Sequence, residues 1–202
     1  MRRMNSKGVR SLLTALKLTH LRFRSTRDVT SVKMPSNVEI KAKVGDLENM
    51  KRKAKEVSGS DGVLIVQEDT FFNATTGRLK LRQLQNEKSM LIFYNRPDQT
   101  GPKFSEYHIT TIEDPESLKV TLGKAYGIKG VVKKKRFLFL VDQTRIHVDD
   151  VEGLGSFMEL EVVMKENQTT EEGQQIAEDL MKKLDIQENS LITGAYMDLL
   201  LK

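Results

Sequence analysis

The chain contains 202 residues, which is long enough for one domain with a substantial buried core. It has no cysteine, which excludes disulfides, thiolate metal sites and cysteine nucleophiles, and its three histidines argue against a zinc site built from several of them. A metal ion is therefore expected among carboxylates, which favour Mg²⁺, Mn²⁺ or Ca²⁺. No apolar run approaches the roughly 20 residues of a membrane span.

The first 33 residues differ in composition from the rest of the chain. They contain nine of the 33 Lys and Arg residues and one of the 28 Asp and Glu residues, which leaves 24 basic and 27 acidic residues in the remainder. The net charge of +5 is therefore no evidence for nucleic-acid binding, since the body of the protein is mildly acidic. A basic, Ser/Thr-rich segment with apolar residues at helical spacing is typical of a mitochondrial transit peptide.

Two other interpretations of residues 1–33 stay open: a basic, disordered tail, or upstream sequence absent from the working protein. Met34 can serve as an internal start directly before the first predicted strand. The protein is expected in the cytoplasm in that case, and in the mitochondrion if the segment is a transit peptide. Either way, we assign the fold to residues 34–202.

The remaining sequence predicts eight strands and four helices. Period-2 alternation and β-branched residues predict strands at about residues 37–44, 63–72, 78–85, 89–96, 104–112, 130–141, 143–150 and 156–165. Amphipathic spacing predicts helices at about residues 47–57, 115–126, 170–184 and 194–201. Asp46, Asp114 and Thr169 are suitable N-caps for the first three helices.

Several predicted strands are apolar on one face and almost entirely charged on the other. The alternation is uninterrupted at residues 38–44 and recurs at residues 78–82, 145–149 and 157–162. The short connections favour antiparallel pairing, and eight antiparallel strands can close into a barrel. If the charged faces point inward, the apolar faces point outward and meet the amphipathic helices. We therefore predict a mainly β (α+β) fold, a closed eight-stranded antiparallel barrel with helices packed outside and a charged tunnel within.

Confined charges need partners, because desolvated ions are costly. A triphosphate with a bound divalent metal meets this need, since Lys and Arg bind phosphate oxygens and carboxylates bind the metal. In the segment 133–136, the alternation places Lys134 and Arg136 inward and Lys133 and Lys135 outward. This small-molecule site requires no nucleic acid and no membrane, and the sequence leaves monomer and homodimer open.

The motifs that carry the alternation resemble those of the CYTH superfamily, the triphosphate tunnel metalloenzymes. Residues 38–43 resemble the amino-terminal signature, and residues 144–161 resemble a longer signature of the class IV adenylate cyclase-like branch. Further matches fall in the family's order at residues 69–72, 80–82, 96, 105–107 and 134–136. The resemblance covers about residues 37–200, and we therefore predict that residues 34–202 form a CYTH domain.

The resemblance implies a triphosphatase that uses Mg²⁺ or Mn²⁺. By position, the implied metal ligands are Glu39, Glu159 and Glu161, with Asp149 as a further acid. The implied phosphate-binding residues are Lys41, Lys43, Lys80, Arg82, Arg96, Lys134, Arg136 and Arg145. Glu39, Lys41 and Glu161 are the expected catalytic residues.

One position departs from the family's pattern. The common signature is Glu-x-Glu-x-Lys, whereas this chain has Lys41 in place of the middle acid. The first strand thus brings one carboxylate, which leaves open how many metals bind and which group activates water. The added positive charge favours inorganic tripolyphosphate, hydrolysed to diphosphate plus phosphate, over a nucleotide.

Other functions stay open. Within the family they are a class IV-type adenylate cyclase and a thiamine triphosphatase, although the sequence offers no clear aromatic cluster on the predicted tunnel face. A non-catalytic polyphosphate- or nucleotide-binding module would keep the cations and lose the carboxylates, which are present here. His147 is either a hydrogen-bonding wall residue or a proton-transfer group, and Asp69 could simply bond a neighbouring arginine.

Overall fold

The computed structural model describes residues 34–202, so the expectations for residues 1–33 lie outside the described part. The strands are β1 (Ser36–Lys43), β2 (Val63–Phe72), β3 (Arg78–Leu84), β4 (Ser89–Asn95), β5 (Lys103–Ile112), β6 (Ile128–Val141), β7 (Thr144–Val151) and β8 (Gly155–Val163). The helices are α2 (Leu47–Ser58), α3 (Pro115–Tyr126), α4 (Thr170–Leu184) and α5 (Tyr196–Leu200), with a 3₁₀ turn, η3 (Glu188–Ser190). All predicted elements are present, within about two residues at their ends.

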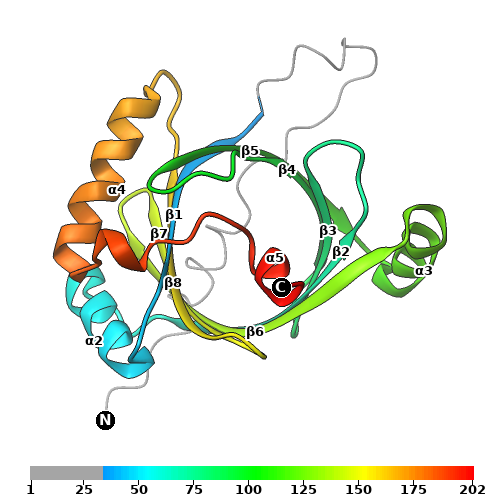
Figure 1. Ribbon diagram of the computed structural model, residues 1–202, viewed down its shortest axis with the longest axis horizontal. Coiled ribbons are helices and arrows are strands. Elements are labelled where there is room, and N and C mark those ends of the chain that lie inside the picture. Colours follow the sequence, from blue (N-terminus) through cyan, green and yellow to red (C-terminus); the bar gives the residue numbers. More distant parts are fainter. Residues whose placement is uncertain (1–33) are drawn as a thin grey trace. The chain divides into compact units, whose positions relative to one another are not determined.

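The eight strands form one closed barrel in the order β1-β5-β4-β3-β2-β6-β7-β8 (Figure 1). Every neighbouring pair is antiparallel, and β8 pairs with β1 to complete the ring. Short turns join most sequential strands, and Asn86 and Asp142 supply the positive φ that such tight turns require. The prediction of a closed eight-stranded antiparallel barrel is therefore confirmed.

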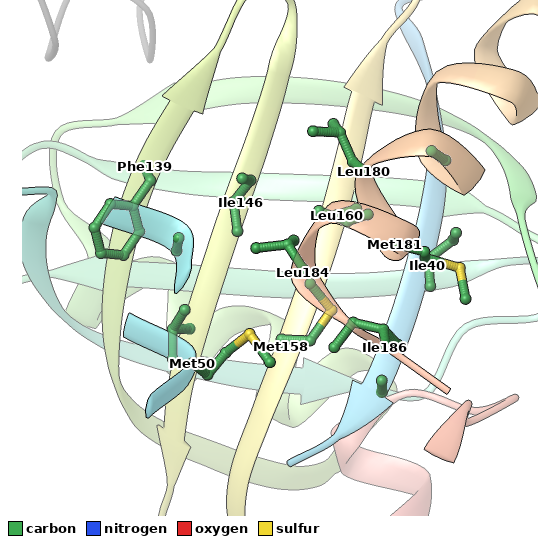
Figure 2. Close-up of a cluster of buried hydrophobic side chains, with 14 of the residues drawn as sticks. Ile40, Met50, Phe139, Ile146, Met158, Leu160, Leu180, Met181, Leu184 and Ile186 are labelled. Atoms are coloured by element: carbon green, nitrogen blue, oxygen red, sulfur yellow. The ribbon is translucent and has the colours of Figure 1, made fainter. Parts of the chain in front are cut away.

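The main apolar core lies outside the barrel, between the outward face of β1, β7 and β8 and the helices α2 and α4. Figure 2 shows Ile146 and Leu160 on the strands facing Leu184 on α4, and all three are fully buried. Burying each such side chain contributes roughly 1.5–3 kcal/mol. Helix α3 also lies outside, held to the wall by polar contacts such as Lys119 Nζ to Glu68 Oε1 at 3.0 Å.

Helix α5 departs from the expectation that the helices pack outside. Figure 1 shows it within the outline of the ring, and Tyr196 and Met197 pack with inward-facing Phe71, Val132 and Phe157. The preceding chain is tied to β1 by a hydrogen bond from Ile192 N to Lys41 O at 2.9 Å. The physical reason is that this end of the barrel interior is apolar, so α5 completes a second core there.

No helix within residues 34–202 is both long enough and apolar enough to span a lipid bilayer.

Candidate functional site

The barrel interior holds a strongly charged cavity. Within residues 34–202, seven cations and four acids line it: Lys41, Lys80, Arg82, Arg96, Lys134, Arg136, Arg145, Glu39, Asp69, Glu159 and Glu161. The structure thus brings together most of the residues that the sequence singled out. Lys43 and Asp149 are the two exceptions, and neither lines the cavity.

Strand register sets which charges face each other. Glu39 on β1 lies opposite Glu161 on β8, and Lys41 lies opposite Glu159. On the other side of β8, Glu161 lies opposite Arg145 and Glu159 lies opposite His147 on β7. Because side chains alternate between the two faces of a strand, all these residues point to the interior. One row therefore pairs two acids, which is unfavourable unless a cation lies nearby.

Lys41 forms a buried ion pair with Glu159. Its Nζ lies 2.8 Å from Glu159 Oε1 and 4.1 Å from the centre of the Tyr196 ring. Arg136 donates to the second oxygen of the same carboxylate. Burial alone would raise the pKa of Glu159, but Lys41 and Arg136 hold it well below its usual value. Lys41, which replaces the family's second acid, is therefore bound directly to one of the cavity's acidic residues.

Glu39 and Glu161 each have an arginine on one oxygen. Arg96 Nη1 lies 2.6 Å from Glu39 Oε2, and Arg145 Nε lies 2.7 Å from Glu161 Oε2. Burial raises the pKa of Glu161, but Arg145 and His147 lower it to about 2. Glu161 is therefore ionised near neutral pH, which is the state that a divalent metal requires of a carboxylate ligand.

His147 is buried beside two of these carboxylates. Its Nδ1 lies 3.7 Å from Glu159 Oε2 and 3.8 Å from Glu161 Oε1, which is too long for hydrogen bonds. Within the part of the chain that the structure describes, Nδ1 has no hydrogen-bond partner. Burial and Arg136 lower the pKa of His147, which leaves the imidazole neutral near pH 7.

These three residues form a cluster that fits a metal ion. One ligand atom from each of His147, Glu159 and Glu161 lies within 4.8 Å of the others. Two carboxylates and a neutral imidazole are suitable donors for a divalent cation. Of the implied metal ligands, Glu159 and Glu161 are therefore together, and Glu39 lies directly opposite Glu161.

Asp149 has a different environment from that of an open metal ligand. It is fully buried, and its oxygens accept hydrogen bonds from Arg136 Nε at 2.7 Å, Lys134 Nζ at 3.2 Å and the Tyr196 hydroxyl at 3.0 Å. Burial raises the pKa of Asp149, but Arg136 and Lys134 lower it strongly. Two cations and a hydroxyl saturate this carboxylate, so its position suits orienting those cations.

Asp69 holds a second pair of cations in the same way. It accepts from Arg82 Nε at 2.9 Å, Lys80 Nζ at 3.0 Å and the Gln67 amide at 2.9 Å. Sequence reasoning allowed for an arginine partner here. Two aspartates on different strands therefore fix four of the seven cations that line the cavity within residues 34–202.

Lys43 lies at the end of β1 and is exposed. Its Nζ is 6.0 Å from the Phe157 ring, where the barrel interior has become apolar. Alternation alone places Lys43 on the inner face of β1. It cannot show that the charged part of the barrel interior ends at Lys41, the preceding inward-facing residue of this strand.

Sequence reasoning missed Lys103, which is buried with 1% of its surface exposed. Its Nζ donates to Ile192 O at 2.8 Å and Thr193 O at 3.0 Å, so it anchors the segment that leads to α5. Burial, with Arg96 and Lys41 nearby, lowers the pKa of Lys103 to about 8. The only available signal was its position at the start of a strand after a loop.

Aromatic side chains also line the cavity, where the sequence shows no aromatic cluster suited to stacking adenine. They are Phe71, Tyr94, Tyr107 and Tyr196. They come from β2, β4, β5 and α5, one from each element. A cluster assembled from single residues in distant segments leaves no local pattern in the sequence.

Comparisons with known proteins agree with this architecture. A Methanocaldococcus jannaschii protein named "Putative adenylate cyclase" is 26% identical over 171 residues, which cover 80% of this chain and 97% of that protein. The solved structure of the PH1012 protein from Pyrococcus horikoshii OT3 has 27% identity and a TM-score of 0.71, covering 81% of this chain and 98% of that one.

A Vibrio parahaemolyticus protein of known structure is also described as a "putative adenylate cyclase". It shares 19% identity with this chain, with a TM-score of 0.67. The aligned region covers 84% of this chain and 100% of the Vibrio chain. At this identity the similarity shows the fold alone. The CYTH domain family model matches residues 36–196, which is most of the chain. With its closed eight-stranded tunnel, this chain belongs to the CYTH domain family.

Proposed function

We propose that the protein is a metal-dependent triphosphatase that hydrolyses inorganic tripolyphosphate to diphosphate and phosphate. The observation that supports this most is the charge of the enclosed cavity. Among residues 34–202, seven cations and four acids line it, and two of those acids lie beside His147. An excess of buried positive charge requires an anionic ligand, and a short phosphate chain supplies several charges in a small volume.

The cations are positioned before a ligand arrives. Asp69 holds Lys80 and Arg82, and Asp149 holds Lys134 and Arg136. Phosphoryl transfer depends mainly on positioning and on electrostatic stabilisation of the phosphoryl oxygens. Fixed guanidinium and ammonium groups therefore provide this stabilisation with little reorganisation during the reaction.

The acidic cluster would hold Mg²⁺ or Mn²⁺ through Glu39, Glu159 and Glu161. The bound metal would offset the negative charge that develops on the phosphate chain. Because the pKa of Glu161 is about 2, this carboxylate is a weak base, and we assign it to orienting the attacking water as well as binding metal. Lys41, with its Nζ on Glu159, would contact the phosphate nearest the metal.

A nucleotide is the second candidate substrate. The names of the relatives and the apolar and aromatic cavity side chains Tyr107, Ile92 and Ile109 favour it. A flat, apolar base could pack against such groups. In that case, ATP would be cyclised or hydrolysed in the same tunnel.

The test gives the full 202-residue chain tripolyphosphate, ATP and thiamine triphosphate in parallel, with Mg²⁺ or Mn²⁺. Phosphate, diphosphate and cyclic AMP are measured. We expect phosphate release to be fastest from tripolyphosphate. Cyclic AMP from ATP would replace the hydrolase proposal with a cyclase, and tight binding without any product would indicate a non-catalytic module.

A further inference from the structure

Several polar atoms inside the barrel are buried without a partner. Within residues 34–202 they include Asn37 Oδ1, Ser105 Oγ, two nitrogens of Arg96 and Nδ1 of His147. Leaving a buried polar atom unpaired costs free energy, so each such atom indicates a missing ligand or water. The unpaired nitrogen of His147 lies beside two carboxylates, those of Glu159 and Glu161, which favours a cation as its missing partner.

The spacing around His147 is that of ligand atoms around one small cation. Its Nδ1 lies 3.7 Å from Glu159 Oε2 and 3.8 Å from Glu161 Oε1. Donor atoms that each lie about 2.1 Å from a shared metal are roughly 3 to 4 Å apart. Nδ1 is therefore too far from either carboxylate oxygen to form a hydrogen bond and close enough to share an ion with both.

We propose that His147 is a direct metal ligand that adds a nitrogen donor to Glu159 and Glu161, with Glu39, opposite Glu161, as the remaining carboxylate of the site. The proposal rests on the metal dependence proposed above and goes beyond it by naming the ligand set and the kind of metal. Imidazole nitrogen suits transition-metal ions, whereas Mg²⁺ prefers oxygen ligands only. The site is thus expected to bind Mn²⁺ more tightly than Mg²⁺.

Lys41 explains why this cluster holds one metal. The Lys41 Nζ lies 2.8 Å from Glu159 Oε1, so its ammonium group already neutralises that oxygen of the carboxylate. The opposite oxygen, Oε2, also accepts from Arg136, but a carboxylate oxygen has a second lone pair that can face a cation. The free position is therefore the one between Glu159 Oε2, Glu161 Oε1 and His147 Nδ1.

The test measures Mn²⁺ alone bound to the full chain by electron spin-echo envelope modulation, with and without ¹⁵N labelling of histidine only. We expect nitrogen coupling that changes from ¹⁴N to ¹⁵N in the labelled protein. His147→Ala should lose this coupling and weaken Mn²⁺ binding about tenfold or more. His108→Ala is the matched control, since His108 is exposed and should change neither quantity.

Bound Mn²⁺ without histidine coupling in the wild-type protein overturns the proposal, as does a failure to bind Mn²⁺. If His147→Ala does not fold, coupling that persists in both His20→Ala and His108→Ala assigns it to His147, the third of the chain's three histidines. Phosphate release is measured in the same samples, which separates the two proposals. Histidine coupling without hydrolysis of any triphosphate would support the proposed metal site and contradict the proposed triphosphatase activity. Hydrolysis without histidine coupling would support the triphosphatase activity and contradict His147 as a metal ligand.

Discussion

Strands β1, β7 and β8 present one face to helices α2 and α4 and the other to the barrel cavity. On the outward face, Ile40, Ile146 and Leu160 are completely buried in an apolar core. On the inward face, Lys41 and Glu161 belong to a network of opposed charges. Apolar burial stabilises the fold, whereas a buried ion pair contributes little net stability because its desolvation cost is high.

This difference separates stability from chemistry along a single strand. Residues that are adjacent in the sequence lie on opposite faces, so Leu160 and Glu161 have different roles although they share a peptide bond. Substitutions on the outward face should change the free energy of unfolding, and substitutions on the inward face should change binding and turnover. Four experiments test where this separation holds.

The largest expected effect is on the inward face. Glu161→Gln removes a negative charge from the metal cluster while keeping the size of the side chain, and we expect kcat to fall by about a thousandfold. Triphosphate binding should remain, because the Lys and Arg residues that line the cavity are unchanged. Steady-state phosphate release and calorimetric binding check this, with exposed Glu166→Gln as the control. Full activity in Glu161→Gln would contradict the metal assignment.

The outward face should respond in the opposite way. Leu160→Ala leaves a cavity in the core beneath α4 and should lower the free energy of unfolding by about 2–5 kcal/mol, with little change in kcat. Chemical denaturation measures the first quantity and phosphate release the second. Val120→Ala, at a residue that is 57% exposed, should change stability by less than about 0.5 kcal/mol. A loss of activity at unchanged stability in Leu160→Ala would break the comparison.

Lys41 sharpens the comparison because it is an inward residue with an effect on stability. Lys41→Glu restores the family's common acid but places it opposite Glu159, so like charges meet in a buried row. We expect a loss of about 1–3 kcal/mol in metal-free protein, partly recovered on adding Mn²⁺. Thermal melts with and without Mn²⁺ test this against Lys135→Glu, a charge reversal at an exposed residue. Equal stability in both variants without metal would argue against a structural role for the Lys41–Glu159 pair.

The barrel could be predicted because its signal is local. Alternation of the kind seen at Lys80-Leu81-Arg82 indicates directly which side chains share a face of the strand. Short turns then restrict which strands can pair. The environment of Asp149 could not be predicted in this way, because its partners come from β6 and α5. The position of Tyr196 inside the barrel depends on how the chain runs from Ile192, which is tied to β1, into α5, and no periodicity encodes this path.

The same distinction applies to the candidate metal site. Glu159 and Glu161 are visible as an alternating pair on one strand, whereas the unpaired nitrogen of His147 becomes evident only from interatomic distances. Sequence pattern identifies the residues of the inward face, and three-dimensional neighbours decide which of them pair with each other and which are left for a ligand.

The smallest expected effect concerns pH and the segment that leads to α5. Burial first, and then nearby cations, lower the pKa values of Lys80 and Lys103 to about 8, whereas in the unfolded chain both titrate near 10.5. Between these values the unfolded state binds more protons, so stability should rise with pH from about 8 towards 10. A neutral Lys103 amine can still donate to Ile192 O and Thr193 O, so its deprotonation relieves charge burial without releasing the segment.

Lys103→Met isolates this contribution. It removes one titrating group, and the rise in stability between pH 8 and 10 should shrink by about 1–2 kcal/mol, while the part due to Lys80 and to Lys134, whose pKa burial also lowers, persists. Denaturation at several pH values measures the slope, and exposed Lys88→Met should leave it unchanged. An unaltered slope in Lys103→Met would mean that Lys103 is solvated in the folded protein. A reduced slope with unchanged kcat at pH 7 would show that Lys103 is an inward-facing cation with a purely structural role. The separation of stability from chemistry would then apply only to the charged middle of the tunnel.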